Sequence, residues 1–141
     1  MIDIICKQES FKNIKTKCKV IFHQRKKFET IMKYDGITSE DIMNSMNIEK
    51  NIDRIFSAGE GAGQSGSFFF FSYDNRFIIK TMRGSERQNL LNMLDDLLKH
   101  IVNTSNTTLI SKIYGVFTIK SSMFSPIDII VMQNSVLRDN K

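Results

Sequence analysis

Hydrophobic positions recur every three or four residues over the first quarter of the chain. This spacing is typical of an amphipathic helix, and it predicts a long helix over residues 10–34 that ends before Gly36. The positions that define its apolar face are Phe11, Ile14, Cys18, Phe22, Phe28 and Met32. Thr38, with Asp41 three residues later, has the pattern of a capping box and predicts a second, short helix over residues 38–46.

The pattern changes in the centre of the chain, where short aromatic and β-branched runs predict strands. One candidate strand covers residues 53–58, and two more, at 68–73 and 76–81, flank a turn at 74–75 as in a β-hairpin. Leucines at helical spacing then predict a helix over residues 85–103, with Ser85 and Gln88 at its start. Two further strands are expected, at about 109–119 and 127–132.

These elements predict an α+β fold. We expect a five-stranded antiparallel sheet with one packed helix, preceded by N-terminal amphipathic helices. The length of 141 residues suggests a single domain, and a content of 41% hydrophobic and 25% charged residues excludes wholesale disorder. The two cysteines, Cys6 and Cys18, are too few for a disulfide framework or a zinc site, so we expect a cytoplasmic chain.

The formal net charge of +5 comes from the first quarter of the chain. Five lysines form a stripe beside the apolar face of the first predicted helix: Lys12, Lys15, Lys19, Lys26 and Lys33. Such a stripe can be a patch that attracts an anionic membrane surface, or the solvated side of a helix that packs on the domain. The wide apolar face favours the second interpretation.

Three glycines, Gly61, Gly63 and Gly66, fit the spacing G-x-G-x-x-G, which several phosphate-binding loops share. A dinucleotide-binding loop opens a helix, and a Walker A loop has Lys and Ser or Thr after its last glycine. Here Ser67 and four phenylalanines follow, which predicts a strand. The remaining possibility is a kinase-type hairpin over the phosphates of ATP, with Lys80 as the positioning lysine. A glycine-rich hairpin with an incidental lysine has the same spacing.

The same residues resemble the signature of the phosphatidylinositol phosphate kinase family. The matching segments are 63–71, Asp74, 77–81, 90–91, 93–94, 108–109, 114–116, 131–132 and Asn134, with Phe28, Gly36, Ile37, Asp41 and Ser45 upstream. The resemblance implies that residues 27–135 are a partial kinase domain, the N-terminal lobe. It leaves residues 1–26 as a basic amphipathic helical extension and residues 136–141 as a tail.

The resemblance implies an ATP-dependent transfer of the γ-phosphate to the inositol ring of a phosphatidylinositol monophosphate, most like the reaction of a phosphatidylinositol-4-phosphate 5-kinase. The cofactors would be ATP and Mg. Lys80 would position the phosphates of ATP, and the residues that cover them would be Gly61, Gly63, Gln64, Ser65, Gly66 and Ser67. Gln64 stands where the family usually has Lys or Arg. Glu86 is either an acidic partner of Lys80 or, as we favour, a carboxylate stabilised by the helix dipole.

The family's D-L-K-G-S segment, its catalytic and metal-binding aspartates and its activation loop do not occur in these 141 residues. We therefore expect this chain alone to be inactive, and we expect the missing C-terminal lobe or a partner chain along the edge formed by residues 127–132. The other expected partners are ATP and an anionic phosphoinositide surface at the cytosolic face of a membrane, with no nucleic acid. The alternative function is a non-catalytic fragment or pseudokinase that binds nucleotide or a partner.

Overall fold

The computed structural model of the chain describes residues 18–60 and 67–135. Within these ranges it contains nine helices and strands, in the order β1 (Cys18–His23), α2 (Arg25–Tyr34), α3 (Ser39–Ser45), α4 (Ile48–Glu60), β2 (Phe69–Phe71), β3 (Phe77–Met82), α5 (Gly84–Asn103), β4 (Ile113–Ser121) and β5 (Ile127–Gln133). None of the described helices is long and apolar enough to cross a lipid bilayer.

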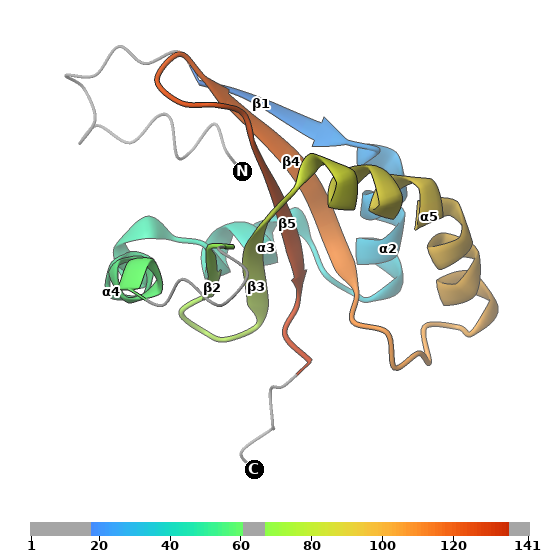
Figure 1. The fold of residues 1–141 in the computed structure, drawn as a ribbon. Helices are drawn as coiled ribbons and strands as arrows, with labels where there is room; N and C mark the ends of the chain where they lie inside the picture. Colours follow the sequence, from blue (N-terminus) through green and yellow to red (C-terminus); the bar gives the residue numbers. More distant parts are fainter. Residues whose placement is uncertain (1–17, 61–66, 136–141) are drawn as a thin grey trace.

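All five strands form one antiparallel sheet in the order β1-β4-β5-β3-β2 (Figure 1). The long helix α5 and the shorter α2 lie together near the β1–β4 side, and α3 and α4 lie toward β2 and β3 (Figure 1). This arrangement confirms the predicted α+β class and the five-stranded antiparallel sheet.

The sheet carries a hydrophobic core on each face, because successive residues of a strand point to opposite sides. One core joins α2 and α5 to the sheet, and its buried members are Phe28, Ile31, Leu94, Ile101, Val116 and Ile130. The other core contains Met32, Ile42, Phe77, Ile79, Tyr114, Phe117 and Val131. Helix α2 contributes to both cores, so it fixes the β4 side of the sheet relative to α5.

The helix predicted over residues 10–34 is wrong for residues 18–23, which form strand β1. All six residues of β1 pair with β4, from Cys18 opposite Ser121 to His23 opposite Val116. Val20, Ile21 and Phe22 fit a strand as well as a helix, and pairing with β4 decides between the two. Residues 18–23 therefore belong to the sheet and not to the helical extension predicted for residues 1–26. Residues 10–17 lie outside the described ranges.

The strand predicted at residues 53–58 is also wrong, because these residues lie in helix α4. The start of α4 is stabilised by Asn47, whose Oδ1 accepts a hydrogen bond from the backbone N–H of Lys50 at 3.1 Å. This is the N-cap arrangement that Asn favours, and it is a sequence signal for a helix start. The fifth strand of the sheet is therefore β1 and not a strand at 53–58.

The other predicted elements are confirmed with small shifts. Thr38 and Asp41 form the predicted capping box at α3, and α5 covers the helix expected at 85–103. Strand β4 begins at Ile113, four residues later than predicted, and Leu109 is fully exposed. Strand β5 lies in the middle of the sheet, between β4 and β3, so residues 127–132 are not a sheet edge as expected.

Candidate functional site

The predicted phosphate-binding loop joins α4 to β2. Residues 61–66 lie outside the described ranges, so Gly61, Gly63, Gln64, Ser65 and Gly66 stay predictions. The site can therefore be described from the strands on the C-terminal side of the loop.

The entrance to β2 is held against β3 beside Lys80. The backbone N–H of Phe68 donates to Thr81 Oγ1 at 3.0 Å, and the backbone N–H of Thr81 donates to the carbonyl of Phe68 at 2.9 Å. The Thr81 hydroxyl also donates to this carbonyl, at 3.3 Å. Ser67 is partly buried immediately before this contact. Phe68, where the chain leaves the predicted loop, is thus hydrogen-bonded to Thr81, the residue that follows Lys80 in β3.

Lys80 lies in the middle of β3, opposite Phe69 of β2 and Ile130 of β5. Residues directly opposite in a ladder share a face, so Lys80 lies on the face of Ile130, which belongs to the core formed with α5. Lys80 is partly buried, and no carboxylate among the described side chains, those of residues 18–54 and 67–135, forms an ion pair with it. An anionic ligand beside a partly buried ammonium group would be held by charge-assisted hydrogen bonds.

Glu86 lies in the first turn of α5, where its carboxylate has a structural task. Glu86 Oε2 accepts a hydrogen bond from the backbone N–H of Arg83 at 2.7 Å, which satisfies a donor at the start of the helix. Glu86 is exposed, and within the described ranges it forms no ion pair with Lys80. The pairing of Lys80 with Glu86 stays a prediction. The hydrogen bond from the backbone of Arg83 agrees with the other interpretation, in which the Glu86 carboxylate stabilises the start of the helix.

The sequence analysis missed a polar network between α5 and the sheet. Arg87 Nη1 donates to Asp128 Oδ1 at 2.8 Å and to Thr118 Oγ1 at 3.2 Å. The Thr118 hydroxyl donates to Asp128 at 2.5 Å, and His23 Nε2 lies 2.6 Å from Thr118 Oγ1. The network joins α5 to β1, β4 and β5. Its one sequence signal is Asp128, a carboxylate in the apolar run of β5, which needs a buried partner.

The network also changes the acid–base behaviour of His23. Burial lowers the pKa of its imidazole below 6.5, and the nearby Arg87 guanidinium lowers it further, against an opposing effect of Asp128. His23 therefore binds a proton less readily in the folded chain than in the unfolded chain.

Several residues of the family resemblance meet at the turn between β2 and β3. Asp74 accepts hydrogen bonds from the hydroxyls of Ser45 at 2.5 Å and Ser72 at 2.6 Å, and from the backbone N–H of Arg76. Asn134 Nδ2 donates to the carbonyl of Asn75 at 2.7 Å. These contacts tie the hairpin of β2 and β3 to α3 and to the end of β5. Their role is to position the hairpin.

Hydrogen bonding also controls the charge of Asp74. Burial raises the pKa of its carboxyl group, but the hydrogen bonds from Ser45 and Ser72 outweigh it, so the pKa lies below 3.8. Asp74 is thus held ionised in the turn and serves as a charged acceptor.

The described residues hold no group of three or more His, Cys, Asp or Glu side chains that could bind a metal ion. No residue in these ranges is therefore assigned to Mg. The charge that this part of the site offers to a phosphate is the ammonium group of Lys80.

An antiparallel five-stranded sheet, with a lysine in the strand that precedes its long packed helix, has the arrangement of a kinase N-terminal lobe. A sequence model of the family Phosphatidylinositol-4-phosphate 5-Kinase matches residues 50–141, more than half of the chain. The chain belongs to the phosphatidylinositol phosphate kinase family, a family of lipid kinases.

Curated relatives agree with this assignment. The phosphatidylinositol 4-phosphate 5-kinase its3 of Schizosaccharomyces pombe is 45% identical over 80 residues, which are 57% of this chain and 11% of that protein. Phosphatidylinositol 4-phosphate 5-kinase 9 of Arabidopsis thaliana is 47% identical over 77 residues, 55% of this chain and 9% of that protein. A probable phosphatidylinositol phosphate kinase of Dictyostelium discoideum is 34% identical over 100 residues, 70% of this chain and 14% of that protein. The chain therefore spans only a small part of each relative.

Proposed function

We propose that this chain is the ATP-binding N-terminal part of a phosphatidylinositol phosphate kinase. The reaction would transfer the γ-phosphate of ATP to the inositol ring of a phosphatidylinositol monophosphate. The names of the relatives favour phosphatidylinositol 4-phosphate as the lipid and the 5-position as the acceptor.

The observation that carries the proposal is the environment of Lys80. It is partly buried in β3, forms no ion pair with a carboxylate of residues 18–54 or 67–135, and lies next to the hydrogen-bonded entrance to β2. Phosphoryl transfer depends mainly on positioning and on fixed positive charge near the phosphates. Lys80 supplies such a charge, and the predicted loop at residues 61–66 would supply backbone N–H groups on the other side of the phosphates.

The remaining catalytic groups would come from a C-terminal lobe, either in a longer form of this protein or in a partner chain. Phosphoryl transfer also needs acids that hold Mg and a residue that orients the attacking hydroxyl. A second lobe would close the site and exclude water, which strengthens the electrostatic stabilisation of the transferred group. We propose residues 27–135 as the core of the N-terminal lobe, with β1 added to its sheet.

ATP titration of the purified chain tests the proposal directly. Lys80→Met should weaken ATP binding by about 1–3 kcal/mol, the scale of a charge-assisted contact. Lys99→Met is the matched control, because Lys99 is 74% exposed on α5 and the variant loses the same charge. Equal ATP affinity of the parent chain and Lys80→Met would exclude Lys80 from the site.

A transfer assay separates the kinase from the non-catalytic alternative. We expect the 141-residue chain alone to transfer no label from ATP to phosphatidylinositol 4-phosphate, although it binds ATP. Transfer that Lys80→Met abolishes would show that this chain already contains the whole active site. A longer form that binds ATP but transfers no phosphate to any phosphatidylinositol monophosphate would support a pseudokinase.

A further inference from the structure

A buried threonine joins three other polar side chains where α5 begins to cover the sheet. Thr118 of β4 is 3% exposed, and its hydroxyl donates to Asp128 Oδ1 at 2.5 Å. Because its own proton points to Asp128, the Thr118 oxygen accepts hydrogen bonds from Arg87 Nη1 at 3.2 Å and from His23 Nε2 at 2.6 Å. Arg87 Nη1 also donates to Asp128 at 2.8 Å. We call His23, Arg87, Thr118 and Asp128 together the Thr118 network.

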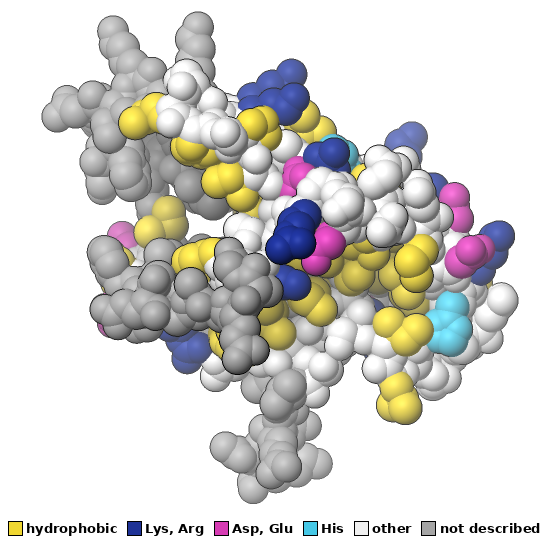
Figure 2. Space-filling view, in the orientation of Figure 1, with side chains coloured by type: hydrophobic (Ala, Val, Ile, Leu, Met, Phe, Trp, Pro, Cys, Tyr) yellow, Lys and Arg dark blue, Asp and Glu magenta, His cyan; other side chains and the backbone are white. Residues whose placement is uncertain are grey.

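The Thr118 network connects elements that are far apart in the sequence. His23 is the last residue of β1, Asp128 lies in β5, and Arg87 lies near the start of α5. In the space-filling view, Lys or Arg, Asp or Glu and His side chains lie close together where the start of α5 covers β1 and β4 (Figure 2). The ion pair between Arg87 and Asp128 thus joins the start of α5 to the sheet.

The Thr118 network lies on the face of the sheet that carries Lys80. In the ladder between β3 and β5, Asp128 stands opposite Met82, and Lys80 stands opposite Ile130. Positions two apart on a strand share a face, so the Asp128 carboxylate and the Lys80 ammonium group leave neighbouring positions of one face. Helix α5 covers this face through the core that contains Ile130, against which Met82 also packs.

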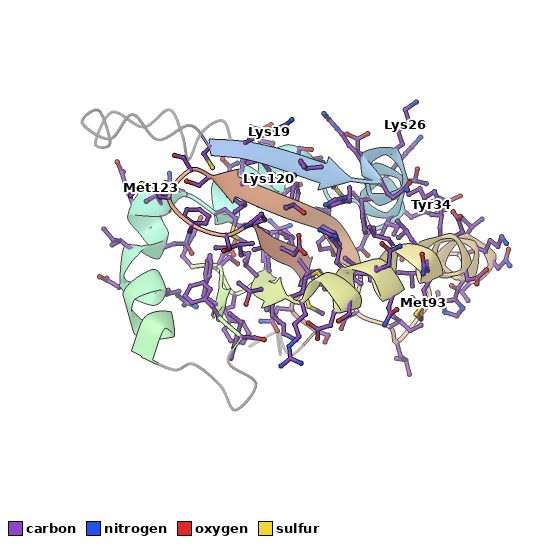
Figure 3. The ribbon with its side chains drawn as sticks, turned by 45° about the horizontal axis from the view of Figure 1, so that its top comes forward. Lys19, Lys26, Tyr34, Met93, Lys120 and Met123 are labelled. Atoms are coloured by element: carbon purple, nitrogen blue, oxygen red, sulfur yellow. The ribbon has the colours of Figure 1, made fainter. Side chains whose placement is uncertain are left out.

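A short connection joins Lys80 to the Thr118 network. Figure 3 shows β3 leading directly into α5, which continues past Met93 toward the side of α2, and only residues 81–86 separate Lys80 from Arg87. Thr81 in this connection donates its backbone N–H to the carbonyl of Phe68, at the end of the predicted phosphate-binding loop. A shift of α5 away from the sheet therefore disturbs the strand end that carries both the lysine and the contact with the loop.

A proton on His23 acts against the contacts of Arg87. Burial lowers the pKa of the His23 imidazole, the Arg87 guanidinium lowers this pKa further, and Asp128 opposes the effect. Coupling between two sites is reciprocal, so a guanidinium that hinders protonation of His23 is itself held less firmly once His23 is protonated. The imidazolium repels the guanidinium and competes with it for the Asp128 carboxylate.

The charged groups that act on His23 from the packed elements are Arg87 of α5 and Asp128 of β5. Other charged side chains of these elements pair with one another or are exposed: Arg25 pairs with Glu29, Lys27 pairs with Asp95, and Glu86 and Lys120 are exposed. The proton on His23 is therefore the charge change that the Thr118 network meets at mildly acidic pH.

We propose that Arg87 is a positioning residue for nucleotide binding, which holds α5 beside Lys80 through the Thr118 network and is released by a proton on His23. ATP binding then weakens as the pH falls below neutral. This inference rests on the proposed function, because it concerns the affinity of the ATP site at Lys80.

ATP titrations of the full chain at pH 7.5 and pH 5.5 test the role of His23. His23→Gln keeps a side-chain N–H for Thr118 but cannot take up a proton. We expect the parent chain to lose about two- to fivefold more affinity than His23→Gln over this range, at or below the lower end for coupled sites. The terminal phosphate of ATP also takes up a proton near about pH 6, and the comparison of the two proteins removes this effect. An equal loss in both would overturn the proposal.

A second titration, at pH 7.5, compares two arginines. Arg87→Met should weaken ATP binding about fivefold, because the start of α5 loses its ion pair with the sheet. Arg25→Met is the matched control: it removes the same charge from α2, at a side chain that is 69% exposed, and should change ATP binding less than about twofold. Equal losses would show that binding follows net charge alone and would contradict the positioning role. In Arg87→Met the additional loss at pH 5.5 should disappear, and its persistence would likewise contradict this role.

A measurement without ATP separates this inference from the proposed function. In amide NMR spectra of the full chain, the signal of Thr81 should shift with pH at the same midpoint as the His23 imidazole, and this shift should be absent in His23→Gln. The amide of Asn75, in the turn before β3, should not follow His23. A Thr81 signal that does not follow His23 would overturn the inference, whether or not ATP binds. If Lys80→Met weakens ATP binding but acidification affects the parent chain and His23→Gln equally, the proposed function stands and this inference fails.

Discussion

Arg87 of α5 and Asp128 of β5 form an ion pair of 2.8 Å, and their side chains are only 29% and 10% exposed. The pair fixes the first turns of α5 against the middle of the sheet. Arg87 follows Glu86 directly, and Asp128 lies in the strand that also pairs with Lys80. The ion pair therefore helps to define the distance between α5 and the strand that carries the candidate nucleotide-binding lysine.

Loss of the Arg87–Asp128 pair should destabilise the fold measurably. Arg87→Met leaves the carboxylate of Asp128 with the Thr118 hydroxyl as its remaining side-chain donor in the described network. Removal of one partner of a fully buried pair costs about 3–5 kcal/mol, and partial exposure of Arg87 reduces the expected loss to about 1–3 kcal/mol. Urea unfolding monitored by circular dichroism measures this loss.

The exposed pair of Arg25 and Glu29 provides the control. Their side chains are 69% and 44% exposed at a distance of 2.7 Å, so Arg25→Met should change the free energy of unfolding by less than about 1 kcal/mol. Equal losses in Arg25→Met and Arg87→Met would show that the Arg87–Asp128 pair has no special role in holding α5.

His23 should make the fold less stable at mildly acidic pH. Burial and the nearby Arg87 lower its pKa below 6.5 in the folded chain, so the unfolded chain takes up a proton first as the pH falls. The free energy of unfolding should therefore decrease as the pH falls from about 6.5 toward the folded pKa. In His23→Gln this decrease should be smaller than in the parent chain. Urea titrations between pH 7.5 and pH 5 check this, and an unchanged pH dependence in His23→Gln would contradict it.

Gly115 should not tolerate a side chain. A Cβ atom at this position would lie 2.6 Å from Phe117 Cε2 and 3.2 Å from Phe22 Cε2. The Phe117 ring cannot easily move, because it is buried and stacks on the Phe22 ring at a centroid distance of 4.4 Å. Gly115→Ala should lower the free energy of unfolding by about 1–3 kcal/mol, the usual cost of overpacking.

Replacement of Gly84 by alanine, in contrast to the same change at Gly115, should not lower the free energy of unfolding. It opens α5, and the nearest atom to its Cβ position is Asp128 Oδ2 at 4.0 Å, an ordinary contact. Gly84→Ala should be neutral or stabilise the chain by up to about 1 kcal/mol, because alanine favours a helix. A thermal melt of both variants measures the difference, and equal effects would contradict the packing described for Gly115.

The turn between β2 and β3 should depend on Ser45. This side chain is 1% exposed, and its hydroxyl donates to the ionised carboxylate of Asp74. Ser45→Ala should lower the free energy of unfolding by about 1.5–3 kcal/mol, the range for a hydrogen bond to a charged group. Ser85→Ala, at an exposed position of α5, should change it by less than about 0.5 kcal/mol. Hydrogen exchange of the β2–β3 amides would show whether the loss is local to this turn.

Asp74 adds a second pH dependence at more acidic values. Its folded-state pKa lies below 3.8, so its contribution to stability is present above that pH and is lost as the pH falls through the folded pKa. Asp74→Asn should therefore be less stable than the parent chain at neutral pH, and the difference should shrink toward pH 2. A constant difference over this range would contradict the assignment of a charged acceptor.

The sequence by itself determined the features that depend on neighbouring residues. Thr38 and Asp41 cap α3 through groups three positions apart, and the aromatic runs on both sides of Asp74 and Asn75 form the predicted hairpin. The leucine spacing that predicted α5 likewise needs no knowledge of distant residues. Local hydrogen bonds and side-chain periodicity control these elements, so a pattern within a few residues is enough to find them. The family resemblance rests on the same local motifs.

Tertiary structure decided the features that depend on residues far apart in the chain. Val20 and Phe22 fit a helix or a strand equally well, and the paired edge of β4, almost a hundred residues later, made them part of a strand. Asp128 signalled that a buried partner was needed, but only the packing of α5 on the sheet identified Arg87 as that partner. The same applies to Lys19 and Lys120, whose opposition arises from the β1–β4 register. Long-range contacts of this kind are specified by shape and burial in the folded chain, which a single sequence pattern does not contain.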